Sequence, residues 1–146
     1  MAASPRAGSP RGRLSDTLAR VAARVLRWEG ARRSRVELAL LGPTAMRRLN
    51  RRATGRRGLT DVIAFTLPQP DGAMLGDVYI CPAAARAFVM GGPADGRLRE
   101  ELVRLVVHGT LHVLGYDHPD GPGRTRSAMW QRQERYVRRL MARRRA

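Results

Sequence analysis

The chain has 146 residues, a single-domain length, and 43% of them are hydrophobic, which excludes a chain that is disordered as a whole. Its 28 basic residues, all of them arginine, outnumber 12 acidic ones to give a formal charge of +16. That charge favours a polyanionic partner, most simply nucleic acid. Cys81 is the only cysteine, so the sequence excludes a disulfide scaffold.

Residues 1–13 are rich in Pro, Gly, Ser and Arg, and we expect a flexible basic arm there, followed by one domain over residues 14–146. The N-terminal sequence lacks the apolar stretch of a secretory signal, and no apolar run approaches the ~18 residues of a membrane span. We therefore expect a cytoplasmic protein without a membrane partner, with a processed leader peptide as the alternative.

Apolar residues at helical spacing predict a first helix from Leu14 to Trp28, with Ser15 as its N-cap and Gly30 ending it. Apolar residues at positions 36, 38 and 40 alternate with other side chains and predict a half-buried strand. A short helix then opens at Gly42-Pro43-Thr44 and runs to about residue 53.

Two further strands are predicted in the middle of the chain. Residues 60–67 are β-branched and aromatic, and residues 76–81 return after a turn at Asp71-Gly72. Pro82 suits the first turn of a helix that stops before Gly91.

The segment from about Asp95 to Leu114 is predicted to be a helix with apolar residues nearly all round it, so we expect it to be the central buried element. A last helix over about residues 123–143 carries apolar side chains on one face and arginines elsewhere. This mixture of strands and helices predicts an α+β fold, with one small mixed β-sheet packed against helices.

All three histidines of the chain, His108, His112 and His118, lie within eleven residues. Residues four apart on a helix share one face, so the first two imidazoles can converge on one ion. Gly115 can take positive φ, end the helix and let the chain present the third histidine. Three nitrogen ligands with an open fourth position describe a catalytic Zn²⁺ site, one ion per chain. The alternative is three unrelated histidines in caps and core.

The spacing also matches the zinc-protease pattern His-Glu-x-x-His-x-x-Gly-x-x-His, but position 109 is glycine instead of glutamate. That glutamate is the general base of the proteases, so peptide hydrolysis by their mechanism is not expected. The hypothesis of a metalloprotease or another metallohydrolase rests on the histidine spacing alone.

The string HGTLHVLGYDH resembles the signature of the YbeY family, metal-dependent endoribonucleases that act in ribosomal RNA maturation. Leu49-Asn50, residues 60–65, residues 76–81 and the late string that begins at Met129 resemble the family's other blocks in order and spacing. The resemblance implies a small sheet with packed helices, and it implies that the three histidines are zinc ligands.

The sequence departs from the family pattern at Thr54, where many members carry an arginine thought to serve the active site. Ala64 likewise replaces a commoner serine. The sequence leaves open which nearby arginine substitutes, the candidates being Arg51, Arg52, Arg56 and Arg57.

Two further residues are candidates for catalytic roles. Asp117 precedes His118 and is placed either to orient a ligand imidazole or to stabilise the turn. Arg104 lies one helical turn before His108, on the same face. There it either reaches a scissile phosphate or forms a salt bridge.

With the resemblance, the leading hypothesis is a zinc-dependent, single-strand-specific endoribonuclease in late 16S rRNA 3′-end maturation, ribosome biogenesis and quality control. Its partners would be ribosomal RNA precursor and the small ribosomal subunit. In it, the metal activates water and polarises the phosphate, while arginines stabilise the transition state. The alternative is a non-enzymatic ribosome-assembly or RNA-binding factor in which zinc mainly holds the fold.

Overall fold

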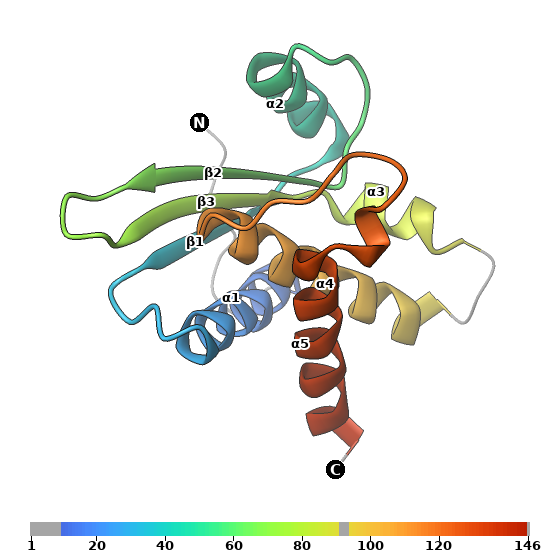
Figure 1. Ribbon diagram of the computed structural model, residues 1–146. Helices are drawn as coiled ribbons and strands as arrows, with labels where there is room; N and C mark the ends of the chain where they lie inside the picture. Colours follow the sequence, from blue (N-terminus) through green and yellow to red (C-terminus); the bar gives the residue numbers. More distant parts are fainter. Residues whose placement is uncertain (1–9, 91–93, 146) are drawn as a thin grey trace.

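A mixed β-sheet of three strands organises the computed structural model, which describes residues 10–90 and 94–145. The middle strand, β3 (Met74–Ile80), runs parallel to β1 (Arg35–Leu40) and antiparallel to β2 (Val62–Pro68) (Figure 1). The small mixed sheet that the sequence predicts is therefore confirmed, and β2 lies at one of its edges.

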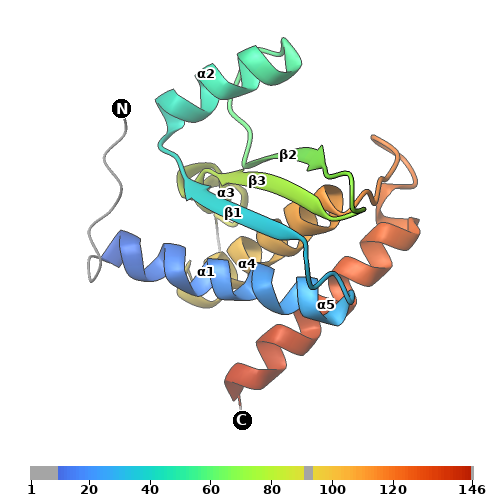
Figure 2. The ribbon, with the colours of Figure 1, turned by 90° about the vertical axis from the view of Figure 1, so that its left-hand side faces the viewer.

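In the described residues, five helices surround this sheet. Their bounds are α1 Pro10–Trp28, α2 Pro43–Thr54, α3 Pro82–Phe88, α4 Ala94–Val113 and α5 Ala128–Arg145, with a 3-10 turn at Arg124–Arg126 before α5. α1 and α4 lie along one face of the sheet, and α2 lies on the other side (Figure 2). None of the helices in these segments is long and apolar enough to cross a membrane.

The first helix starts earlier than the sequence predicted. α1 begins at Pro10, so residues 10–13 are helical and not part of an arm, and Ser15 lies inside the helix instead of capping it. Proline suits a first helical turn because its missing N–H needs no partner there. Gly30, with φ of +70°, ends the helix as expected. Residues 1–9 of the predicted arm lie outside the described residues.

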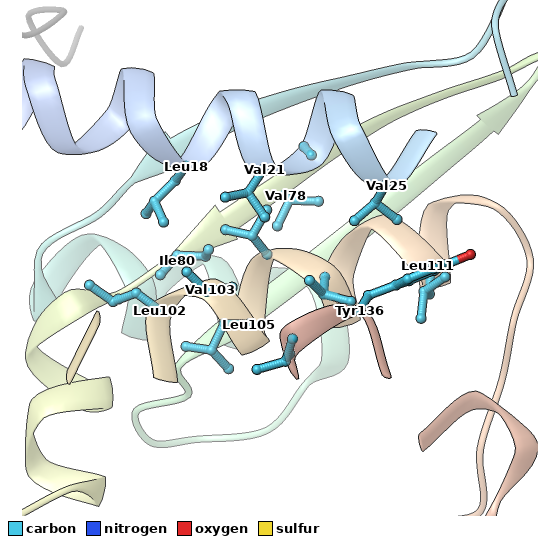
Figure 3. Packing of buried hydrophobic residues seen from close by; sticks show 14 of the residues in the cluster. Leu18, Val21, Val25, Val78, Ile80, Leu102, Val103, Leu105, Leu111 and Tyr136 are labelled. Atoms are coloured by element: carbon cyan, nitrogen blue, oxygen red, sulfur yellow. The ribbon is translucent and has the colours of Figure 1, made fainter. Parts of the chain in front are cut away.

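α4 is the central buried helix, as its all-round apolar pattern predicted. Val106, Val107, Leu111 and Val113 have no exposed surface. Different sides of α4 contact α1, α5 and the sheet, and apolar residues from all of these elements form one cluster (Figure 3). Close packing on every side holds the histidine-bearing helix in a fixed position.

α4 approaches β3 very closely at two glycines. A β-carbon on Gly109 would lie 2.6 Å from a γ-carbon of Val78, and one on Gly76 would lie 2.3 Å from a γ-carbon of Val113. Each glycine therefore receives a buried valine from the opposite element. This interlock explains why position 109 carries no glutamate, since a side chain there would displace α4 from the sheet.

α5 is anchored to the end of α1 through Glu29. This carboxylate, whose side chain is 7% exposed, accepts hydrogen bonds from the Tyr136 hydroxyl and, at 2.8 Å, from Arg132. Burial opposes its charge, but hydrogen bonds from Tyr116 and Tyr136 lower the pKa of Glu29. These contacts tie α5 to the C-terminal end of α1.

Candidate metal centre

The structure brings the three histidines together as the spacing predicted. His108 and His112 project from α4, and Gly115, with φ of +99°, lets the chain turn back and place His118 opposite them. One nitrogen from each imidazole lies within 4.8 Å of the other two. The cluster therefore has the ligand set and the separation for holding a metal ion.

Hydrogen bonds fix the same tautomer in all three imidazoles. Each Nδ1 lies against an oxygen that can only accept, so each Nδ1 carries the proton and each Nε2 keeps its lone pair. The three acceptors are Oε1 of Gln133 for His108 at 2.7 Å, the carbonyl of Tyr116 for His112 at 3.0 Å, and the carbonyl of Pro119 for His118 at 3.0 Å. An amide oxygen and two backbone carbonyls thus leave three Nε2 atoms available for one cation.

The spacing of these lone pairs fits a metal ion. His112 Nε2 and His118 Nε2 are 3.3 Å apart, with neither atom protonated in this arrangement. Two nitrogens bound at about 2.0–2.1 Å to a tetrahedral zinc ion lie about 3.3–3.4 Å from each other. Two facing lone pairs repel unless a cation lies between them, so the observed geometry suits zinc with three protein ligands.

Burial keeps the ligands in the form that binds a metal. His108 is 7% exposed, and burial lowers its pKa to about 4. Burial also lowers the pKa of His112. Both imidazoles are therefore neutral at pH 7, and a metal ion does not have to compete with a proton for them.

Arg104 does not approach the cluster with a free guanidinium. Its Nε and Nη2 donate to the two carboxylate oxygens of Glu134, both at 2.9 Å, and its Nη1 donates to Glu101 at 2.9 Å. Burial opposes the charge, but the hydrogen bonds to Glu134 raise the pKa of Arg104. Of the two interpretations that the sequence left open, the salt bridge is the one that the structure shows.

Asp117 also contacts backbone and not an imidazole. Its Oδ1 accepts the backbone N–H of His118 at 2.8 Å, while the imidazole of His118 donates to a carbonyl. The structure therefore supports the turn-stabilising interpretation of Asp117 over the one that orients a ligand.

A cleft of about 720 Å³ opens beside the histidines. His108, Gly109 and His112 form one wall, and residues of the edge strand β2 form another. The segment after α2 supplies two arginines, Arg56 and Arg57, to the lining. The cleft can therefore place an anionic substrate next to the candidate metal site.

Thr54 has a structural role at the entrance to this segment. Its hydroxyl lies 2.8 Å from the carbonyl of Asn50 and accepts the backbone N–H of Arg56 at 3.1 Å. Gly55, with φ of +72°, then ends α2. This turn directs the chain toward the cleft. All four arginines are exposed, but Arg56 and Arg57 line the cleft, whereas Arg51 and Arg52 lie on α2 outside its lining.

Gln133 belongs to the late string that resembles a family block, but the sequence assigned it no role in the site. It is 1% exposed, on the face of α5 that carries Met129, Tyr136 and Val137 into the core. A polar residue at an apolar position of an amphipathic helix is the signal that identifies it, because a buried amide needs partners. Its partner across the helix interface is His108.

Fold and site together define a class: an α+β protein whose central helix carries a three-histidine metal-binding cluster beside an arginine-lined cleft. A family model described as Endoribonuclease YbeY matches residues 9–141. The chain belongs to this family, which confirms the resemblance noted in the sequence.

Individual relatives agree with this assignment. The Endoribonuclease YbeY of Anaeromyxobacter sp. (strain Fw109-5) is 40% identical over 113 residues, which cover 75% of this chain and 57% of that protein. The Endoribonuclease YbeY of Mycolicibacterium smegmatis is 38% identical over 96 residues, 58% of this chain and 53% of that protein. The chain thus spans little more than half the length of these curated relatives.

One solved structure has a similar fold. The solution structure of TM1509 from Thermotoga maritima matches with a TM-score of 0.59 and 25% sequence identity. The match covers 94% of this chain and 87% of that one.

Proposed function

We propose that the protein is a zinc-dependent endoribonuclease that cleaves single-stranded RNA. The observation that carries the proposal is the convergence of three unprotonated Nε2 atoms, held by Nδ1 hydrogen bonds, beside an arginine-lined cleft whose wall includes His108 and His112. A zinc ion bound there supplies a Lewis acid that lowers the pKa of water and polarises a phosphate.

The residues of the cleft supply the other requirements of phosphodiester hydrolysis. Arg56 and Arg57 are placed to bind the phosphate and to stabilise the charge that grows in the transition state. The chain's +16 charge adds attraction for a polyanion over a longer range. A cleft that is open along an edge strand suits a single RNA strand better than a rigid duplex.

We assign the enzyme to late 16S rRNA 3′-end maturation, ribosome biogenesis and quality control in the cytoplasm. The support is membership of the family together with the basic charge, which suits precursor RNA on the small ribosomal subunit. Purified small subunits that carry a precursor 3′ end test this assignment. We expect them to be shortened by the protein, and subunits that remain unprocessed would contradict this cellular role.

The first experiment measures zinc content and RNA cleavage on one preparation. We expect about one zinc per chain, with cleavage of single-stranded RNA that is lost with a chelator and in His112→Ala. That variant removes one of three ligands, so it should lose both zinc and activity. Undiminished cleavage by the metal-free variant would contradict the mechanism.

The same experiment separates the nuclease from the assembly factor. A protein in which zinc only holds the fold would contain zinc and lose thermal stability in His112→Ala, yet wild type would show no metal-dependent cleavage. Casein cleavage that a chelator inhibits would instead indicate a protease. Gly109 argues against that outcome, because its contact with Val78 leaves no room for a glutamate.

A second experiment identifies the arginines that serve the reaction. Arg56→Ala and Arg57→Ala remove side chains that line the cleft, and we expect at least one of them to lower kcat/KM roughly 10²-fold. Arg51→Ala and Arg52→Ala make the same change on the exposed side of α2 and are the matched controls. Equal losses in all four variants would show that charge alone, and not the cleft, determines the rate.

A further inference from the structure

A network of hydrogen bonds, buried at its histidine end and partly buried beyond it, runs from the candidate metal site into α5 and back to α4. His108 Nδ1 donates to Gln133 Oε1 at 2.7 Å, and Gln133 Nε2 donates to Glu134 at 3.1 Å. Both carboxylate oxygens of Glu134 in turn accept hydrogen bonds from Arg104, which lies one turn before His108 on α4. The hydrogen-bond network therefore starts and ends on α4 and passes through two adjacent residues of α5.

The donor-to-acceptor direction along this hydrogen-bond network is fixed by its charged end. The carboxylate of Glu134 can only accept hydrogen bonds, so the NH₂ group of Gln133 faces it and the amide oxygen faces His108. A reversed amide would place NH₂ groups against Nδ1 of His108 and oxygen against the carboxylate. The imidazole would then carry its proton on Nε2, the atom that faces the other two histidines, and could not ligate a metal.

Arg104 holds the carboxylate that sets this direction. Its bidentate contact fixes both oxygens of Glu134, and Glu101 occupies its remaining Nη1. Burial opposes the charge of Glu134, but the hydrogen bond from Arg104 lowers its pKa and keeps it an acceptor. A paired, partly buried carboxylate is thus the fixed point from which the amide of Gln133 takes its orientation.

We propose that Arg104 and Glu134 are positioning residues: they orient the buried amide of Gln133, which fixes His108 with its proton on Nδ1 and its Nε2 lone pair toward the metal. Arg104 thereby acts on the site by orienting other side chains and not by contacting the substrate. The proposal rests on the metal-binding part of the proposed function.

The test compares four variants with wild type. Gln133→Leu removes the acceptor, and Glu134→Ala removes the group that orients it. Glu100→Ala is the matched control, because it deletes a half-exposed carboxylate that is also paired with Arg104, at 3.7 Å, whereas the amide of Gln133 bonds to His108 and Glu134. The double variant Gln133→Glu with Glu134→Gln exchanges the two side chains, so a carboxylate accepts from His108 and an amide accepts from Arg104.

Two readouts do not depend on activity. Long-range ¹H–¹⁵N NMR of the metal-free protein at pH 7.5 reports which nitrogen of His108 carries the proton, and competition with a chromophoric chelator measures zinc affinity. We expect the Nδ1–H tautomer in wild type and in Glu100→Ala. Gln133→Leu and Glu134→Ala should populate the Nε2–H tautomer and bind zinc about 10–100-fold more weakly, and the exchanged double variant should recover affinity.

Two results would overturn the inference. One is an Nε2–H tautomer of His108 in metal-free wild type. This measurement does not depend on any variant being able to fold. The other is zinc affinity in Glu134→Ala equal to that of Glu100→Ala. A wild type that binds zinc but does not cleave RNA would defeat the proposed nuclease and leave these measurements valid, so the two failures are distinguishable.

Discussion

At the scale of single residues, the site is defined by which nitrogen of each imidazole carries the proton. Three imidazoles keep Nε2 free because carbonyl and amide oxygens hold the proton of each Nδ1. Burial disfavours the charged form of His108 and His112, so the site is ready for a cation before one arrives. The folded state therefore prefers neutral histidines, and this preference has a consequence for stability.

Metal-free protein should lose stability as the pH falls. Burial lowers the pKa of His108 to about 4 in the folded state, while the unfolded value is about 6.5. A depressed pKa means that the unfolded state binds the proton first, so stability is complete above pH 6.5 and falls toward pH 4. Urea unfolding should show a loss of about 2 kcal/mol from His108 between pH 7.5 and pH 5.

The variant His108→Gln supplies the comparison for this prediction. It has no group that titrates at this position, so its loss of stability over the same pH interval should be smaller by about the same amount. Identical pH dependence in the variant and in metal-free wild type would show that His108 is not held neutral by burial.

At the scale of elements, the contact between α4 and β3 determines how deep the histidines lie. Val78 packs over Gly109, and Val113 packs over Gly76, so helix and strand cannot slide along each other. Thr66 of β2 adds a hydrogen bond from its hydroxyl to the carbonyl of Val113 at 2.9 Å, at the end of α4. These contacts hold the histidine-bearing turns of α4 against the wall of the cleft.

Gly109→Ala should therefore destabilise the protein, although alanine is the better helix former. Forcing a methyl group against Val78 costs about 1–3 kcal/mol, and helix propensity returns about 1 kcal/mol. Adding Val78→Ala makes room for that methyl group, so the two changes should be coupled by at least about 1 kcal/mol in denaturant unfolding. Additive effects would mean that the close contact does not limit residue 109.

Much of this arrangement could be predicted from sequence because its signals are local. The histidine ligands lie within one string, and α4 is long and apolar on all sides, so both its place in the core and the cluster follow from spacing. The start of α1 was missed because Pro10 and Gly12 are typical of loops, yet both lie in the helix.

The parts that could not be predicted depend on contacts between distant segments. Gln133 meets His108 only after α5 docks on α4, and Arg56 joins the cleft only after the turn at Thr54 brings it there. For Arg104, sequence places the side chain on the correct helix face but cannot show that Glu134, thirty residues later, pairs with it.

At the scale of the whole molecule, the charge of the chain is expected to govern its encounter with the proposed RNA substrate. The +16 charge comes from arginines spread over the chain, so most of them would attract the proposed RNA without contacting a particular phosphate. The arginines of the cleft differ, because the cleft fixes where a phosphate can sit. Salt dependence distinguishes these two kinds of arginine.

RNA binding should weaken steeply with salt, and the slope should report the contacts in the cleft. Each phosphate neutralised on a single strand contributes about 0.7 to the slope of log K against log salt. With a chelator present to prevent cleavage, Arg56→Ala or Arg57→Ala should reduce the slope by about this amount. Arg51→Ala should change it less, and equal reductions would show that RNA does not follow the cleft.

The interlock of Gly109 with Val78 also limits how this sequence can evolve. A mutation that adds volume at position 109 is harmful unless the residue at position 78 has already become smaller. The change at position 78 must therefore come first, and the reverse order passes through a destabilised protein. Among related chains, the sizes of these two residues should vary together, as should those of Gly76 and Val113. The distance between a helix and a strand would then be readable as covariation in an alignment.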